Sequence, residues 1–173
     1  MSRDFPSYDE HDAPVAARAG LAEARKAFGA IPAPLARYAS SPLMMKTALA
    51  ALDAFDQSSL EPLEREVLAI TMGHVAGCRF CVAMHRRRLS HVGAEHDLVQ
   101  ALEAPGPLPN ERLEGLRRFV VNAFERRGDV DAETFARFRE HGFSHQQALD
   151  ALLGVGVYTL TTFANRLTET SET

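Results

Sequence analysis

Apolar positions recur every three to four residues along most of this chain, and that spacing predicts α-helices rather than strands. Ala, Leu, Glu and Arg dominate the sequence, and alternating runs of β-branched residues are missing. Helix start signals, a proline or a capping residue, precede the apolar runs, and glycines follow several of them. The sequence therefore predicts an all-α fold.

Capping and breaking residues divide the chain into a series of helices. We expect helices over residues 14–28, 34–40, 42–55, 60–76, 78–92, 94–102 and 111–127, a short one after residue 131, and a long last one over 145–167. The expected N-caps are Ser41, Ser59, Asn110, Asp131 and Ser144. Gln147 follows Ser144 by three residues, which is the spacing of a capping box. The proline-rich stretch 105–109 is the clearest predicted loop.

The length of the chain bounds its organisation. A chain of 173 residues fits one domain with a real buried core. We expect an N-terminal arm over residues 1–13, a single helical domain over 14–167 and a polar tail over 168–173.

Composition and charge narrow the class of protein. Hydrophobic residues make up 46% and charged residues 24%, which is ordinary for a soluble globular protein. With 19 basic and 23 acidic residues the net charge is −4, which disfavours a nucleic-acid partner. No apolar run approaches the roughly 20 residues that span a bilayer, and the polar segment 1–7 has no signal-peptide core. We therefore expect a cytoplasmic protein without a membrane partner.

Both cysteines of the chain, Cys78 and Cys81, lie in one C-x-x-C motif, and His85 follows four residues later. Residues three and four apart share a face of a helix, so these three side chains form one stripe. The motif opens a helix just after Gly77, where free N–H groups and the helix dipole favour a thiolate over a thiol. The spacing also lets the sulfurs meet in a small-ring disulfide, which favours redox chemistry.

Glu66 lies twelve residues before the first cysteine, on the preceding predicted helix. If the two helices form an antiparallel hairpin around Gly77, Glu66 and His85 come to similar heights. The carboxylate can then face the imidazole and orient it as a base or proton relay. Two thiols, an imidazole and a carboxylate are the parts that dithiol redox chemistry needs.

The order Glu66, Cys78-x-x-Cys81 and His85 resembles the active-site signature of alkyl hydroperoxidase D and the wider carboxymuconolactone decarboxylase-like family. Segments 63–67 and 163–167 also resemble that family, and segment 28–32 resembles its peroxidase-related branch.

The resemblance implies an all-α fold assembled as a ring-like homo-oligomer, a trimer or hexamer, with thiol-dependent peroxidase activity. By analogy with the family, Cys81 attacks a small-molecule hydroperoxide and Cys78 resolves the sulfenate into a disulfide. Glu66 and His85 then form the proton relay. No bound cofactor is implied; an external dithiol, a lipoyl group or a thioredoxin-like protein, resets the pair.

The chain departs from the best-studied branch of the family at one position. That branch has a histidine just before the second cysteine, where this chain has Phe80 after Arg79. One member of the relay is therefore absent. The decarboxylase branch lacks the cysteine pair, so its presence here favours redox chemistry over lactone decarboxylation.

Other interpretations of the same residues stay open. A zinc site would take three ligands from the motif and a fourth from Glu66, His74 or His91, but no second pair of zinc-ligand spacing is present. A thioredoxin-like site would need a strand before the motif. A redox-sensing or partner-binding helical protein is the remaining alternative. We expect the arginines 86–88 to lie on a solvated helix surface or at a subunit contact, or to dock an acidic reductant.

Overall fold

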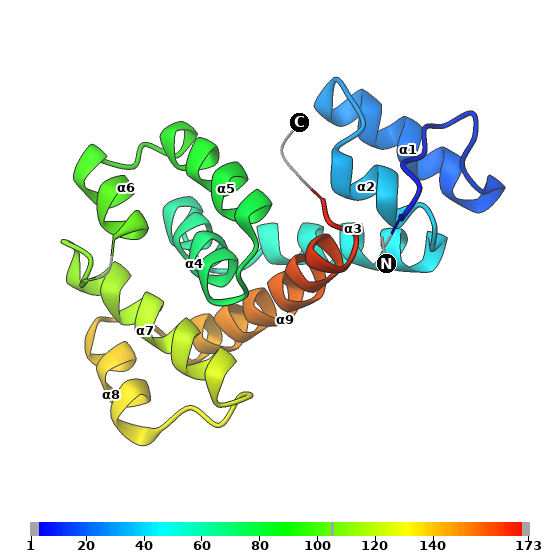
Figure 1. Cartoon of the computed structure of the whole chain (residues 1–173). Helices are drawn as coiled ribbons and strands as arrows, with labels where there is room; N and C mark the ends of the chain where they lie inside the picture. The colour runs from blue at the N-terminus through cyan, green and yellow to red at the C-terminus, as the bar shows by residue number, and fades with distance from the viewer. Residues whose placement is uncertain (1–3, 105, 171–173) are drawn as a thin grey trace.

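The computed structural model describes residues 4–104 and 106–170, and all regular structure in these two segments is α-helical (Figure 1). The helices are α1 (Val15–Phe28), α2 (Ala33–Tyr38), α3 (Pro42–Asp56), α4 (Pro62–Val75), α5 (Arg79–His91), α6 (His96–Glu103), α7 (Glu111–Glu125), α8 (Ala132–Glu140) and α9 (His145–Leu167). The predicted all-α class is confirmed. Within the described residues, none of these helices is both long and apolar enough to cross a bilayer.

Most predicted N-caps act as caps. The side chains of Ser41, Asn110, Asp131 and Ser144 each accept a hydrogen bond from the backbone N–H three residues on. Each cap satisfies one of the amide groups that the first helical turn leaves free.

The prediction of Ser59 as a cap of α4 is wrong. Pro62 occupies the first helical position, so the cap falls on Glu61, whose N–H donates to the Glu64 carboxylate at 2.9 Å. Ser59 lies two residues too early and binds Asp150 of α9 instead, with its backbone N–H at 2.8 Å. Proline at the first position sets the start of a helix more firmly than a nearby serine.

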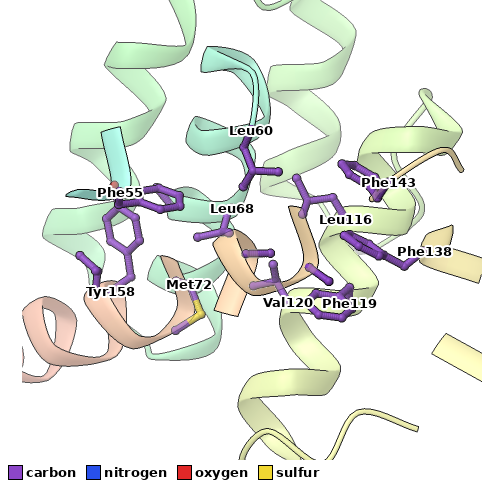
Figure 2. Close-up of a cluster of buried hydrophobic side chains, with 14 residues drawn as sticks. Phe55, Leu60, Leu68, Met72, Leu116, Phe119, Val120, Phe138, Phe143 and Tyr158 are labelled. Carbon is purple, nitrogen blue, oxygen red and sulfur yellow. The ribbon is translucent and has the colours of Figure 1, made fainter. Parts of the chain in front are cut away.

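The main core lies between α4, α7 and α9, with α3 and α8 at its edges (Figure 2). It is rich in aromatic side chains: Phe138 stacks on both Phe119 and Phe143 at ring-centroid distances of 4.4 and 4.3 Å. A second cluster joins α1, α2 and α3, and a third lies between α4, α5, α6 and the start of α7. Helix α9 passes from the first cluster to the second and so links the two ends of the molecule (Figure 1).

Helices α4 and α5 form a closely packed hairpin. One glycine, Gly73, lies between the two helices, and another, Gly77, lies at the turn. A Cβ atom on Gly73 would lie 3.0 Å from a methyl carbon of Val82 and 3.1 Å from its backbone nitrogen. Gly77 turns the chain with a φ of 65°, a conformation that costs glycine little. The hairpin therefore carries the C-x-x-C motif on its turn.

The predicted N-terminal arm contacts α2 where it is described. The Tyr8 N–H donates to the Ala36 carbonyl at 3.0 Å, and Arg37 donates to the Phe5 carbonyl at 3.0 Å. Residues 1–3 of the arm and 171–173 of the predicted tail lie outside the described residues, as does position 105 in the predicted loop. The division into arm, domain and tail stays a prediction.

Candidate functional site

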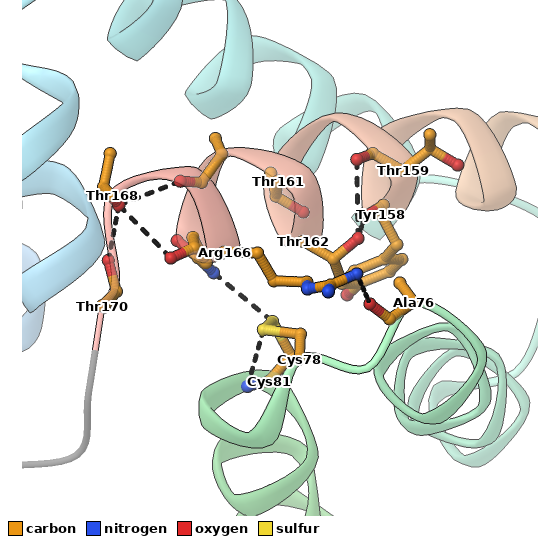
Figure 3. Close-up of a disulfide and its surroundings, with 12 residues drawn as sticks. Ala76, Cys78, Cys81, Tyr158, Thr159, Thr161, Thr162, Arg166, Thr168 and Thr170 are labelled. Atoms are coloured by element: carbon orange, nitrogen blue, oxygen red, sulfur yellow. Dashed lines mark hydrogen bonds between the residues drawn. A yellow bond between two sulfur atoms is a disulfide. The ribbon is translucent and has the colours of Figure 1, made fainter. Parts of the chain in front are cut away.

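Cys78 and Cys81 lie at the turn of the α4–α5 hairpin, with their sulfur atoms joined in a disulfide and their Cα atoms 5.3 Å apart (Figure 3). Cys78 is the N-cap of α5, and its sulfur accepts a hydrogen bond from the Cys81 N–H at 3.3 Å. Both cysteines are 3% exposed. The start of α5 thus directs amide dipoles at the first sulfur, as the sequence predicts.

The hairpin brings Glu66 of α4 and His85 of α5 together. His85 Nδ1 lies 2.7 Å from Glu66 Oε2, and both side chains are buried. Arg88 reaches the other oxygen of the same carboxylate, with Nε 2.9 Å from Oε1. The Glu66 carboxylate is thus contacted from both sides, and its contact with Nδ1 orients the imidazole.

The second nitrogen of His85 is the unusual atom of the site. Nε2 is buried and has no hydrogen-bond partner among the described residues, although buried polar atoms are normally paired. The ring of Tyr158 from α9 packs edge-on against the imidazole, with centroids 5.1 Å apart. Burial, and then the negative charge of Glu66, raise the pKa of Tyr158 well above its ordinary value. His85 therefore offers an unused proton acceptor one helical turn beyond Cys81.

The end of α9 covers the other side of the disulfide (Figure 3). Asn165 donates from Nδ2 to the Cys81 sulfur at 3.4 Å, and Tyr38 of α2 donates its hydroxyl to Asn165 Oδ1 at 2.6 Å. Arg166 donates to the Ala76 carbonyl at 2.7 Å and so ties α9 to the turn before the motif. Three elements far apart in sequence therefore fix the position of the second sulfur.

Two surface hollows meet at the first cysteine. One, of about 680 Å³, lies between the motif and the end of α9, and Arg79, Phe80 and Arg166 contribute to its wall. The other, of about 280 Å³, lies towards α6 and includes Val82 and Arg86. Cys78 lines both hollows, whereas Cys81 faces Asn165. Both hollows therefore reach Cys78 and neither includes Cys81 in its wall, although the two residues are equally buried.

The other two histidines considered from the sequence, His74 and His91, are exposed. His74 lines the smaller hollow beside Cys78, whereas His91 Nδ1 lies 2.9 Å from the Arg87 carbonyl. In the two described segments, no group of three or more His, Cys, Asp or Glu side chains is placed to hold a metal ion. The described residues therefore provide no set of ligands that would support the zinc interpretation.

Sequence reasoning missed four contributors to the site. Arg88 is exposed, as expected, but its pairing with buried Glu66 was missed; its place three residues after His85, on the same helix face, was the available signal. Asn165 was noted only as part of a family-like segment. Tyr38 and Tyr158 had no local signal, because only the packing of α2 and α9 brings them to the hairpin.

Residues 42–105, which include the whole α4–α5 hairpin, match the model of the carboxymuconolactone decarboxylase family. No curated protein is significantly similar in sequence to this chain.

Solved structures share the fold over nearly the whole chain. An uncharacterised peroxidase-related protein with an alkylhydroperoxidase AhpD core, from Ralstonia eutropha JMP134, is 21% identical over 94% of this chain and 87% of its own, with a TM-score of 0.79. A peroxidase-related protein from Silicibacter sp. TM1040 is 20% identical over 96% and 88%, also with a TM-score of 0.79. The debrominase Bmp8 is 14% identical over 100% and 94%, with a TM-score of 0.80. The chain therefore has the alkylhydroperoxidase D-like fold, and its segment 42–105 is similar to the carboxymuconolactone decarboxylase family.

Proposed function

We propose that the protein is a thiol-dependent peroxidase that reduces hydroperoxides through a Cys78–Cys81 dithiol cycle. One observation carries the proposal: in the part of the chain that the structure describes, the buried Glu66–His85 pair leaves Nε2 of the imidazole without a partner, on the α5 face that also carries Cys81. A structural histidine would use both nitrogens. A general base needs one nitrogen held by a carboxylate and the other free for the proton that it takes.

The first step converts a thiol and a hydroperoxide into a sulfenic acid and an alcohol. His85 Nε2 accepts the proton of Cys81, and the Glu66 carboxylate stabilises the imidazolium that forms. The thiolate sulfur attacks the terminal peroxide oxygen and the O–O bond breaks. The leaving alkoxide takes the proton back from His85 and departs as the alcohol, so that the sulfur carries the hydroxyl.

The second step closes the disulfide. The Cys78 sulfur attacks the sulfenic sulfur, and the hydroxyl group leaves as water with the proton of Cys78. An external dithiol, a lipoyl group or a thioredoxin-like protein, then gives two electrons and two protons to restore both thiols. Cys78 lines both surface hollows, so it is the sulfur at which an incoming thiolate forms the mixed disulfide. A cycle of this kind suits the reducing cytoplasm.

The test begins with stoichiometry. One equivalent of an organic hydroperoxide is added to the reduced, metal-free protein, and free thiols are counted over time. We expect the loss of two thiols per chain and a mass decrease of about two hydrogens. Thiols that persist for hours would contradict the proposal.

Cysteine variants then assign the two sulfurs. Cys81→Ser is expected to lose the reaction, whereas Cys78→Ser is expected to react once and stop at the sulfenic acid, which a dimedone-type probe traps. The opposite pattern would make Cys78 the attacking residue. That outcome would agree with its place at the helix N-terminus.

Relay variants have matched controls on α5 and α6. His85→Gln and Glu66→Gln are expected to slow thiol loss by about 10²- to 10⁴-fold, the usual contribution of general base catalysis. His91→Gln changes an exposed histidine of the same helix, and Glu103→Gln removes the exposed carboxylate that pairs with Arg86. Both controls should react at the normal rate. Equal slowing of test and control variants would show that the pair has no part in proton transfer.

A second candidate function follows from the debrominase similarity, which covers the whole chain. The structure of a debrominase variant with a cysteine replaced by alanine was solved with 2,3,4-tribromopyrrole. The same dithiol here would reduce an aryl bromide: two thiols become a disulfide, the ring gains hydrogen and hydrogen bromide leaves. Bromide release from a bromopyrrole, with two thiols lost and no reaction with hydroperoxide, would favour this function over the peroxidase.

A further inference from the structure

Each sulfur of the cysteine pair accepts a hydrogen bond from a different N–H group. The Cys78 sulfur accepts from the backbone N–H of Cys81 at 3.3 Å, whereas the Cys81 sulfur accepts from Nδ2 of Asn165 at 3.4 Å. The first donor belongs to the opening turn of α5, and the second comes from the last helix, α9. The second sulfur thus depends on a side chain from a distant segment for this contact.

The backbone around the motif by itself favours Cys78 as the nucleophile. Cys78 is the N-cap of α5, where the helix dipole and the free amide groups stabilise a thiolate, and it lines both hollows. Cys81 lies three residues further along the chain and is in the wall of neither hollow. A reaction that begins at Cys81 therefore needs a local interaction that favours negative charge on the second sulfur.

The side-chain amide of Asn165 supplies such an interaction. Asn165 is buried, and Tyr38 binds its oxygen at 2.6 Å, so the NH2 group is directed towards the Cys81 sulfur. A buried N–H donor binds an anionic sulfur more strongly than a neutral one, and it thereby favours the thiolate over the thiol. Asn165 also belongs to the wall of the larger hollow beside Cys78, so a substrate in that hollow lies next to the amide.

We propose that Asn165 is a catalytic residue that selects Cys81 as the attacking sulfur, by donating an amide hydrogen to the Cys81 thiolate in the reduced protein. His85 takes the thiol proton, and the amide stabilises the charge that remains on the sulfur. When the disulfide forms, the charge is lost, and the N–H group keeps the contact with the neutral sulfur. The proposal rests on the proposed dithiol cycle and adds to it the group that distinguishes the two thiols.

Alkylation of single-cysteine proteins tests the proposal without a peroxide. In a Cys78→Ser background, the rate of reaction with iodoacetamide is measured against pH, and its midpoint reports the pKa of Cys81. Asn165→Ala removes the donor, and we expect the midpoint to rise by about one pH unit. Asn165→Asp keeps an acceptor for Tyr38 but places a negative charge beside the sulfur, so we expect a larger rise.

Two controls separate this role from a structural one. Thr168→Val removes a buried hydroxyl at the end of α9 whose partners are two carbonyl groups of that helix and the Thr170 hydroxyl (Figure 3), and it should leave the Cys81 midpoint unchanged. In a Cys81→Ser background, Asn165→Ala should leave the midpoint of Cys78 unchanged. All these variants keep Tyr38 and the other titratable or charged groups around the pair, which are Glu66, Arg79, His85, Tyr158, Arg166 and Glu169.

Helical circular dichroism verifies that each variant is folded. A Cys81 midpoint that stays the same in both Asn165 variants would overturn the proposal, and so would an equal rise in Thr168→Val or at Cys78. Alkylation consumes no hydroperoxide, so this result is separate from the test of the peroxidase cycle. Thiols that persist with hydroperoxide refute the cycle, whereas an unshifted midpoint refutes the role of Asn165.

Discussion

Tyr38 binds the side-chain amide of Asn165, which in turn contacts the sulfur of Cys81. Removal of the Tyr38 hydroxyl tests how much this hydrogen bond contributes to stability. The hydroxyl has one proton to donate and lies 2.6 Å from Asn165 Oδ1, the nearer acceptor, and 2.9 Å from the Thr161 carbonyl; all three residues are buried. Burial raises the pKa of Tyr38 well above its ordinary value, so the hydroxyl keeps its proton in any ordinary buffer. Tyr38→Phe therefore removes a donor and changes little else.

The expected cost follows from what the substitution leaves behind. A typical hydrogen bond contributes about 1 kcal/mol, and a buried acceptor without a donor costs about 1–3 kcal/mol. Asn165 Oδ1 loses its close partner, so we expect Tyr38→Phe to lower the free energy of unfolding by about 1–2 kcal/mol. In a chain of this size, that change lowers Tm by roughly 2–8 °C.

A double-mutant cycle isolates the pair. Asn165→Ala alone should cost a similar amount, but the double variant should cost about 1 kcal/mol less than the sum, because the unpaired acceptor is gone. Urea unfolding of the oxidised protein measures all four corners. Tyr8→Phe is the matched control, since its ring packs with the same N-terminal cluster and its hydroxyl lies outside this network. Additive single costs would refute the view that Tyr38 orients Asn165.

Further outcomes follow from other parts of the structure. Gly154→Ala should lower the free energy of unfolding by about 1–3 kcal/mol in urea titrations, because its Cβ would lie 2.6 Å from the buried ring of Phe55. Burial disfavours the charge of Glu114, but hydrogen bonds from Arg117 and Arg118 outweigh it and hold the pKa at about 2. The folded state therefore favours the carboxylate, and this stability, present above the ordinary value of 4.5, is lost as the pH falls towards 2. Urea midpoints at pH 6 and pH 3 should differ less in Glu114→Gln than in the wild type. Reduction of the disulfide, which closes a very short loop, should lower stability by no more than about 2 kcal/mol in thermal melts with and without dithiothreitol.

Local signals accounted for the helices and for part of the site. Caps and breakers are read within one turn of the chain, so the bounds of α3, α7, α8 and α9 follow closely from their capping residues and the glycines or prolines beside them. The predicted cap of α4 was wrong because Glu61 and Glu64 form a capping box around Pro62. Ser59 lies outside this box and binds Asp150 of α9. Helical spacing alone likewise predicted that Cys78, Cys81 and His85 share one face of α5.

Contacts between segments that are far apart in the sequence could not be predicted from local patterns. From the amino-acid pattern alone we could predict a helical chain, two thiols on one helical turn, and a Glu66 that meets His85 if the helices form a hairpin around Gly77. The packing of α2 and α9 brings Asn165 to the second sulfur and Tyr38 to Asn165, and it leaves Nε2 of His85 without a partner among the described residues. It also decided which face of α9 stays exposed, because an amphipathic pattern shows that a helix has an apolar face but not whether its own chain covers it. The physical reason is range: caps and helix faces depend on neighbours three or four residues away, whereas burial and cross-helix hydrogen bonds depend on how whole helices pack.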